Sequence, residues 1–201
     1  MNKNGLGKNP GNPLSKKQLW IAVAIFALAL VVRLVYLYGA SKKPTFLAPI
    51  VDSLEYDKLA RALAAGRGMG LGFFWQAFFY PLYLSVAYFF THGSILQAKI
   101  IQIVFGSALC VLVYRLGEKV FDHRTGILAG VITAMYAPLA FFESELLATG
   151  WASIWSVVLI LLLLKAGQAK GKRIYLLLGI CGGLSIITRA TFLPFFVVSA
   201  V

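Results

Sequence analysis

Long apolar runs alternate with short polar segments along most of the chain. The runs cover residues 18–38, 95–116, 126–142, 151–164 and 174–188, and another begins at residue 192. An α-helix rises 1.5 Å per residue, so about 20 apolar residues are enough to cross the hydrocarbon core of a bilayer. The pattern predicts an all-α, polytopic membrane protein with about five to six transmembrane helices.

Residues 52–65, "DSLEYDKLARALAA", form a different, amphipathic pattern. The i, i+3, i+4 spacing places Asp52, Glu55 and Tyr56 on one stripe of a predicted helix. The D-x-x-E spacing is also that of a capping box, in which Asp52 accepts from the backbone and Glu55 reaches back to the helix start. The two roles are compatible, because a cap would hold the Asp52 carboxylate in place.

A dense aromatic segment follows, and its apolar part covers only residues 80–90. That length is roughly half of a membrane crossing. Pro81 suits the first turn of a helix, and aromatic rings favour the headgroup region. The segment is therefore predicted to lie on the outer leaflet or dip into it as an interfacial helix. Its rings form an aromatic belt or, alternatively, stack on sugar rings.

The same pattern divides the chain into two parts. Residues 1–17 are polar and rich in Gly, Pro and Asn, which predicts a disordered tail with almost nothing to bury. Residues 18–201 form one predicted transmembrane domain with a long outer loop at 39–94. The sequence ends in the apolar run "FFVVSAV", so this domain is expected to continue in a longer protein.

Composition and charge narrow the class of protein. Of the 201 residues, 60% are hydrophobic and only 13% are charged, which is outside the range of soluble domains. The net charge of +12 raises nucleic-acid binding as an alternative. Such binding requires basic residues gathered on one exposed face, whereas here they lie in short clusters between apolar runs. No nucleic-acid partner is predicted.

The basic clusters predict the orientation, because Lys and Arg mark cytoplasmic loops. They are Lys3, Lys8, Lys16 and Lys17 in the tail, Arg115, Lys119 and Arg124 in one turn, and Lys165, Lys170, Lys172 and Arg173 in another. With these segments in the cytoplasm, the loop 39–94 and the segment "ESELLATG" face outward. The outer side then holds Asp52, Glu55, Asp57, Glu143 and Glu145.

Other motifs predict little chemistry. "GRGMGLG" lacks both G-x-G-x-x-G and a G-K-S/T ending, so a turn is favoured over a phosphate-binding loop. Gly179 and Gly183 form a G-x-x-x-G pair, which is typical of helix packing. The two cysteines each fall in the middle of a span, where a thiol behaves as a small hydrophobe, and the two histidines lie on opposite faces of the membrane, so neither a disulfide framework nor a His-rich metal site is predicted.

Five segments carry a resemblance to a known family. In chain order they are "DSLEYDKLARALAAGRG", "YPLY", "FDHRTGILAG", "ESELLAT" and "GICGGLSIITRATFLPF". Together with the predicted topology, this ordered set resembles the membrane-embedded C-type (GT-C fold) glycosyltransferases, specifically the protein O-mannosyltransferase and lipid A aminoarabinose transferase group. The resemblance covers about residues 16–201 and corresponds to the amino-terminal portion of such enzymes.

The resemblance implies transfer of a sugar from a polyprenyl-phosphate carrier to a lipid, glycan or protein acceptor. The reaction would take place at the outer face of a bacterial inner (plasma) membrane. It implies that Asp52 is the catalytic carboxylate and that Glu145 lies across the same cavity, with Glu143 as the less favoured occupant of that place. A carboxylate can accept the proton of the acceptor hydroxyl as its oxygen attacks the anomeric carbon.

Further site residues follow from this reading. Glu55 and Tyr56 share the helix of Asp52, and the outward cations Arg61, Arg67 and Arg189 are candidates to meet the lipid phosphate, with interfacial snorkelling as the alternative. A divalent metal, if used, would be held by Asp52 and Glu145. Two departures from the family bear on phosphate and metal binding: Tyr80 stands where a cation is common, and Ser53 stands where Glu is common.

The competing class is a non-catalytic membrane protein, either a scaffold or a fragment of a transporter. A transporter is expected to place ionisable residues or broken helices near the bilayer midplane. Arg33 and Lys99 are the charges within the apolar runs that this alternative would use. Both are interpreted as lying near enough to the ends of their spans to snorkel outward.

Overall fold

The computed structural model describes residues 15–68, 70, 77–167 and 171–199, and within them the structure is helical with no strand. The all-α prediction is confirmed for this part of the chain. The predicted tail lies outside the described residues up to position 14. Its boundary is two residues too late, because Ser15 and Gln18 form a capping box that starts the first helix at Lys16.

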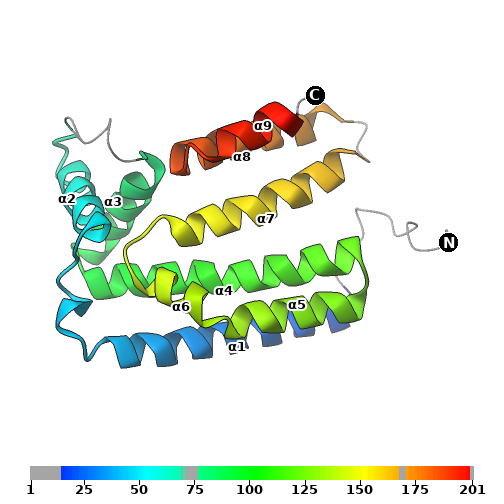
Figure 1. Ribbon diagram of the computed structural model, residues 1–201, viewed down its shortest axis with the longest axis horizontal. Helices are drawn as coiled ribbons and strands as arrows, with labels where there is room; N and C mark the ends of the chain where they lie inside the picture. The colour runs from blue at the N-terminus through cyan, green and yellow to red at the C-terminus, as the bar shows by residue number, and fades with distance from the viewer. Residues whose placement is uncertain (1–14, 69, 71–76, 168–170, 200–201) are drawn as a thin grey trace.

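The helices of the described residues are labelled in chain order in Figure 1. They are α1 (Lys16–Ala40), the short 3-10 helix η2 (Pro44–Phe46), α2 (Asp52–Ala64), α3 (Phe79–Thr91), α4 (Ile95–Val120), α5 (His123–Met135), α6 (Ala137–Ser144), α7 (Thr149–Ala166), α8 (Lys172–Thr188) and α9 (Phe192–Ser199).

Among the described residues, three helices are long and apolar enough to cross a membrane: α1, α4 and α7. The pair α5 and α6 makes a fourth candidate if it is counted as one span, although the two helices meet at an angle of 52°. These helices are consistent with an integral membrane protein. The segments predicted as interfacial are α2 and α3, each of 13 residues.

The helices of the bundle run between two ends (Figure 1). The start of α1, the α4–α5 turn and the end of α7 lie at one end, which we call the basic end because its residues include Lys16, Lys119, Arg124 and Lys165. Helices α2 and α3, the α6–α7 connection and the last turn of α8 lie at the other end, which we call the α2–α3 end. The basic segments therefore share one end, as the charge pattern predicts.

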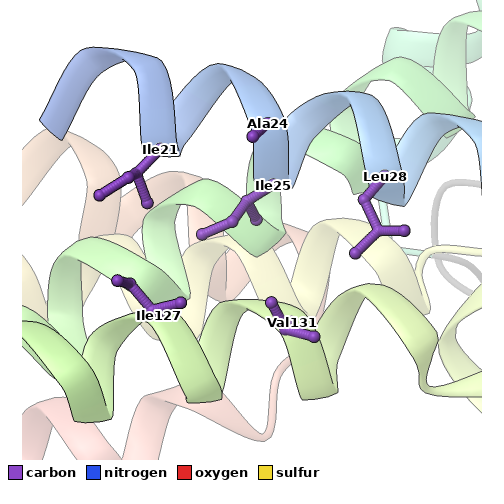
Figure 2. Close-up of a pocket in the computed structure, with 6 residues that line it drawn as sticks. All are labelled: Ile21, Ala24, Ile25, Leu28, Ile127 and Val131. Atoms are coloured by element: carbon purple, nitrogen blue, oxygen red, sulfur yellow. The ribbon is translucent and has the colours of Figure 1, made fainter. Parts of the chain in front are cut away.

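Helix α4 lies at the centre and packs against α1, α5, α6 and α7. Small residues permit the close approach of α4 and α5: a Cβ added to Gly126 would lie 2.7 Å from the Tyr114 carbonyl oxygen. A stripe of α1 that includes Ile25 and Ala29 is buried against the same two helices. An open apolar groove of about 250 Å³ between α1 and α5 is lined entirely by aliphatic side chains and offers no polar group for chemistry (Figure 2).

The predicted G-x-x-x-G contact is wrong for the described part of the chain. A Cβ added to Gly179 or Gly183 would meet nothing within 4 Å, so these glycines are not where α8 meets its neighbours. Close packing at glycine occurs instead between α4 and α5, where Gly117 and Gly126 face each other. The spacing of the glycines alone did not distinguish a packed face from an open one.

Candidate active site at the α2–α3 end

Asp52 is the first residue of α2, and the predicted cap is wrong. The N-cap position is Val51, which has φ of 51° and therefore turns the chain through the left-handed region, and no side chain caps this helix. Asp52 is exposed, and its carboxylate lies in the first turn, where the positive end of the helix dipole favours an anion. Glu55 does not reach back to the helix start but pairs with exposed Lys58 at 3.0 Å.

Tyr56 connects Asp52 to the rest of the site. Its side chain is buried, and its ring meets the edge of the Tyr80 ring with centroids 4.8 Å apart. Burial raises the pKa of Tyr56, the negative charge of Asp52 raises this pKa further, and the positive charge of Arg189 lowers it. Asp52, one turn before Tyr56 on α2, and Arg189, which is distant in the sequence, are therefore both electrostatic neighbours of Tyr56.

Arg189 follows α8 directly and is anchored to the neighbouring helix α7. Its Nη2 donates to the Thr149 hydroxyl at 3.0 Å, at the first residue of α7. Six residues further along α7, the Trp155 indole N–H donates to the Thr188 hydroxyl on α8 at 3.0 Å. These contacts tie the ends of α7 and α8 together and hold the Arg189 guanidinium at the α2–α3 end.

Glu145 lies between α6 and α7 and is accompanied by Lys99 of α4. The Lys99 Nζ is 3.5 Å from the Glu145 carboxylate and donates to the Phe46 carbonyl oxygen at 2.9 Å, while lying 4.4 Å from the centre of the Phe46 ring. The Lys99 side chain is 2% exposed and that of Glu145 is 31% exposed. The interpretation that Lys99 snorkels outward is wrong, because its ammonium group is held inside the protein.

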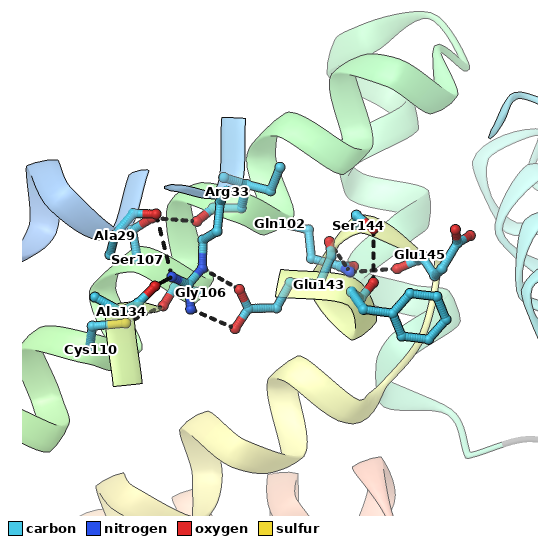
Figure 3. A network of polar contacts seen from close by, with 12 residues as sticks. Ala29, Arg33, Gln102, Gly106, Ser107, Cys110, Ala134, Glu143, Ser144 and Glu145 are labelled. Atoms are coloured by element: carbon cyan, nitrogen blue, oxygen red, sulfur yellow. Dashed lines mark hydrogen bonds and ion pairs between the residues drawn. The ribbon is translucent and has the colours of Figure 1, made fainter. Parts of the chain in front are cut away.

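Gln102 holds the backbone of the Glu145 segment in place (Figure 3). Its amide nitrogen donates to the carbonyl oxygens of Glu143 and Glu145, at 2.9 and 2.6 Å, and its amide oxygen accepts from the Tyr80 hydroxyl at 2.7 Å. Burial raises the pKa of Tyr80 well above its ordinary value, so the phenol remains a neutral donor. This chain of contacts links the Tyr56–Tyr80 pair on α2 and α3 to Glu145.

Of the three predicted cations, only Arg189 is a neighbour of Tyr56. Arg61 lies nine positions after Asp52, which puts the two residues on opposite faces of α2. Its guanidinium donates to the Asp57 carboxylate at 2.9 Å and to the Gly93 carbonyl at 3.1 Å, and the bond to Asp57 raises the pKa of Arg61. It lines an open groove of about 620 Å³ with His92. Arg67 follows α2 and is exposed.

Glu143 is two residues from Glu145 but has a different environment. Its carboxylate accepts from the guanidinium of Arg33 on α1, and both side chains are 0% exposed (Figure 3). The expectation that Arg33 snorkels to the membrane surface is therefore wrong. The structure does not turn the Glu143 carboxylate toward the exposed carboxylate of Asp52.

The side chains around Asp52 and Glu145 bear on the predicted divalent metal site. Among the described residues, no group of three or more His, Cys, Asp or Glu side chains could hold an ion together. The Lys99 ammonium, 3.5 Å from Glu145, already supplies a positive charge to this carboxylate and would repel a dication bound to it. A metal held by Asp52 and Glu145 remains a prediction, and no step below is routed through one.

Three residues of the candidate site were not predicted as site residues from the sequence: Lys99, Gln102 and Thr149. A signal was present for the first two, because polar side chains within an apolar span mark contacts inside the bundle. Thr149 has no comparable signal, since threonine at a helix start is common.

The chain matches no family model, no curated protein and no solved structure.

Proposed function

We propose that the chain belongs to a C-type glycosyltransferase that moves a sugar from a polyprenyl-phosphate donor to the hydroxyl group of a lipid, glycan or protein at the outer face of the membrane. The observation that carries the proposal is the placement of the exposed Asp52 carboxylate, Arg189 and the Glu145–Lys99 pair at one end of the bundle. An exposed carboxylate and cations from separate helices are the groups that this reaction needs.

In the proposed reaction, the acceptor oxygen attacks the anomeric carbon while Asp52 takes its proton. The bond between the anomeric carbon and the carrier phosphate oxygen breaks, and its electron pair leaves with the phosphate. Arg189 is the candidate to offset the charge of this leaving group, since its guanidinium has more donors than the bond to Thr149 uses. Glu145, positioned by Gln102 and neutralised by Lys99, orients the acceptor or the carrier.

The proposed topology has five to six spans with the α2–α3 end outside. Helix α8, with 17 residues, supplies the fifth span and α9 begins a sixth, while α2 and α3 are interfacial helices. The basic end, including the tail, faces the cytoplasm. Lys58→Cys and Arg124→Cys, both at exposed positions, test this with a membrane-impermeant thiol reagent. If the reagent labels Arg124→Cys from outside but not Lys58→Cys, the orientation is the opposite of the proposed one.

The decisive experiment compares the same substitution at two ends of the bundle. Asp52→Asn in the full-length enzyme is expected to lower transfer from a polyprenyl-phosphate sugar by about a hundredfold, because the amide cannot accept the proton. Asp122→Asn is the matched control: Asp122 caps α5 through the Thr125 N–H at 2.8 Å, and Asn caps nearly as well. Near-normal transfer by Asp52→Asn would end the catalytic assignment.

Glu145→Gln separates two roles of the second carboxylate. If Glu145 orients the acceptor or the carrier, transfer falls and added divalent metal leaves it low. Partial recovery with metal would instead favour coordination by Asp52 and Glu145. Protein levels of each variant in the membrane are measured alongside, because Lys99 loses its counter-charge in this variant.

One observation favours the second candidate, a fragment of a transporter. The bent helix pair α5–α6, counted as one span, and the buried ion pair of Arg33 with Glu143 resemble the broken helices and interior charges of transporters. The pair is closed on itself, however, because both side chains are 0% exposed and the Arg33 guanidinium is satisfied by the carboxylate of Glu143 and by carbonyl groups. This arrangement supports a structural role, and the transferase remains the preferred function.

A further inference from the structure

The span formed by α5 and α6 is broken at a position that the sequence explains. Helix α5 ends at Met135, α6 begins at Ala137, and Pro138 is in the first turn of α6. Proline has no N–H, so it cannot donate to the carbonyl four residues earlier, which is that of Ala134. Within a membrane-spanning segment, a carbonyl left without a partner is costly, because no water is present to bond to it.

Arg33 of α1 reaches this carbonyl. Its Nη1 donates to the Ala134 oxygen at 3.4 Å and to the Ala29 oxygen at the same distance, while its Nε and Nη2 bond the two carboxylate oxygens of Glu143 (Figure 3). One guanidinium thus contacts both sides of the break, because Ala134 is the penultimate residue of α5 and Glu143 is in the last turn of α6. Lysine has one nitrogen in place of this planar fork.

Helix α4 is shaped to receive the Glu143 carboxylate. A Cβ added to Gly106 would overlap both carboxylate oxygens, so only glycine leaves room for them at this point. One turn earlier on α4, Gln102 binds the carbonyl oxygens of Glu143 and Glu145. The position of the α6–α7 connection therefore depends on a side chain of α1 and on two positions of α4.

We infer that Arg33 is a positioning residue: by binding Ala134 and Glu143 together, it holds the α5–α6 break in its bent form and thereby places Glu145 beside Lys99. The value of that placement for catalysis rests on the proposed function. The placement itself is a property of the fold and is tested without any transfer assay. A failure of the inference is therefore distinguishable from a failure of the proposed function.

The test measures whether the α6–α7 connection opens when the pair is removed from a folded protein. The full chain carries Cys110→Ala and Cys181→Ala, and Ser144→Cys introduces a reporter thiol at a residue that is 1% exposed next to Glu143. In a second background, Ser185→Cys introduces a thiol at a residue that is 0% exposed in α8 and reports on opening of the whole bundle. Labelling rates with N-ethylmaleimide are compared in the two backgrounds.

The key variant is Arg33→Met/Glu143→Met, which removes both charges so that neither is left unpaired in the bundle. We expect the rate at Ser144→Cys to rise by about tenfold or more, while the rate at Ser185→Cys is unchanged, because the opening is local. Arg33→Lys, which keeps the charge, should raise the Ser144→Cys rate in the same direction by a smaller factor.

Two results would overturn the inference. The first is a rate at Ser144→Cys in the double variant equal to that of the background chain, which would show that the connection keeps its place without the pair. The second is rapid labelling at Ser185→Cys in both Arg33→Met/Glu143→Met and Arg33→Lys. That result would show that the whole bundle needs the ion pair, and not the α6–α7 connection alone. Arg115→Gln, which breaks a pair with Glu118 at the basic end, is the matched control and should leave both rates unchanged.

Discussion

Glu143 and Glu145 are two residues apart and belong to two different regions of the molecule. The interior pair, Arg33 with Glu143, is wholly buried between helices and has its hydrogen bonds supplied by protein groups. The outer corner consists of Lys99 and Glu145. Here the Glu145 side chain is 31% exposed, and its carboxylate is 3.5 Å from the Lys99 Nζ. The difference shows that the end of α6 separates an acid that shapes the bundle from an acid that a ligand can reach.

The largest expected effect breaks the interior pair on one side. Glu143→Leu leaves the Arg33 guanidinium buried without its counter-charge, and we expect a loss of about 3–5 kcal/mol in the free energy of unfolding. Glu145→Leu should cost less, because the Lys99 ammonium that it leaves behind keeps its bond to the Phe46 carbonyl oxygen and the lost carboxylate was 31% exposed. Unfolding in mixed micelles measures both values. Equal losses would show that burial does not distinguish the two acids.

A smaller effect is expected where the interior pair meets the backbone of α4. Gly106→Ala places a methyl group on the Glu143 carboxylate, and overpacking of this kind costs about 1–3 kcal/mol. Gly179→Ala is the matched control in open space on α8 and should raise helix stability by about 0.5–1 kcal/mol. The midpoint of thermal unfolding gives the sign of each change, and stabilisation by Gly106→Ala would contradict the packing described here.

Tyr56, at the same end of the bundle as Glu145, predicts a response to alkaline pH that the interior pair does not. Burial raises the pKa of Tyr56 above its ordinary value of 10.0, so the fold favours the neutral phenol. This contribution to stability is complete below pH 10 and is lost as pH rises through the raised pKa. We expect Tyr56→Phe to flatten the fall in unfolding free energy above pH 10. Tyr38→Phe, at an exposed position, should leave the slope unchanged, and identical slopes for all three proteins would refute the prediction.

The smallest effect concerns an ion pair outside both regions. Glu55→Gln removes the ion pair with Lys58. The side chains of Glu55 and Lys58 are 53% and 59% exposed, respectively. Solvent screens such a pair, so the change in unfolding free energy should be within about 0.5 kcal/mol. The same variant in a transfer assay tests the prediction that Glu55 contacts substrate. A stability loss as large as that of Glu143→Leu would mean that exposure does not decide the strength of these pairs.

The positions of the helices could be predicted well from the sequence. Apolar runs and the amphipathic stripe gave α1, α4, α7 and α2 nearly at their observed bounds, because helical periodicity is a local property. The bend between α5 and α6 was missed, although Pro138 lies inside the predicted span. A proline within an apolar run is a signal that the run does not continue as one straight helix.

The contacts of the site could be predicted only in part. The association of Asp52 and Glu145 with one end of the bundle followed from the charge pattern. The partner of Arg33 did not, because it is 110 residues away and no local pattern links the two. The cap at Asp52 was predicted wrongly because sequence spacing does not reveal the backbone turn at Val51, where φ is 51°.

The same separation of 110 residues has a consequence for synthesis of the protein. Helix α1 leaves the ribosome first, and at about 5–20 residues per second Glu143 follows some 5–20 seconds later. During that interval Arg33 has no carboxylate partner, and an arginine within an inserting helix costs at most about 3 kcal/mol. The apolar residues of α1 outweigh this cost, so the first helix does not depend on the sixth for insertion, but its insertion becomes more favourable once Glu143 has been made.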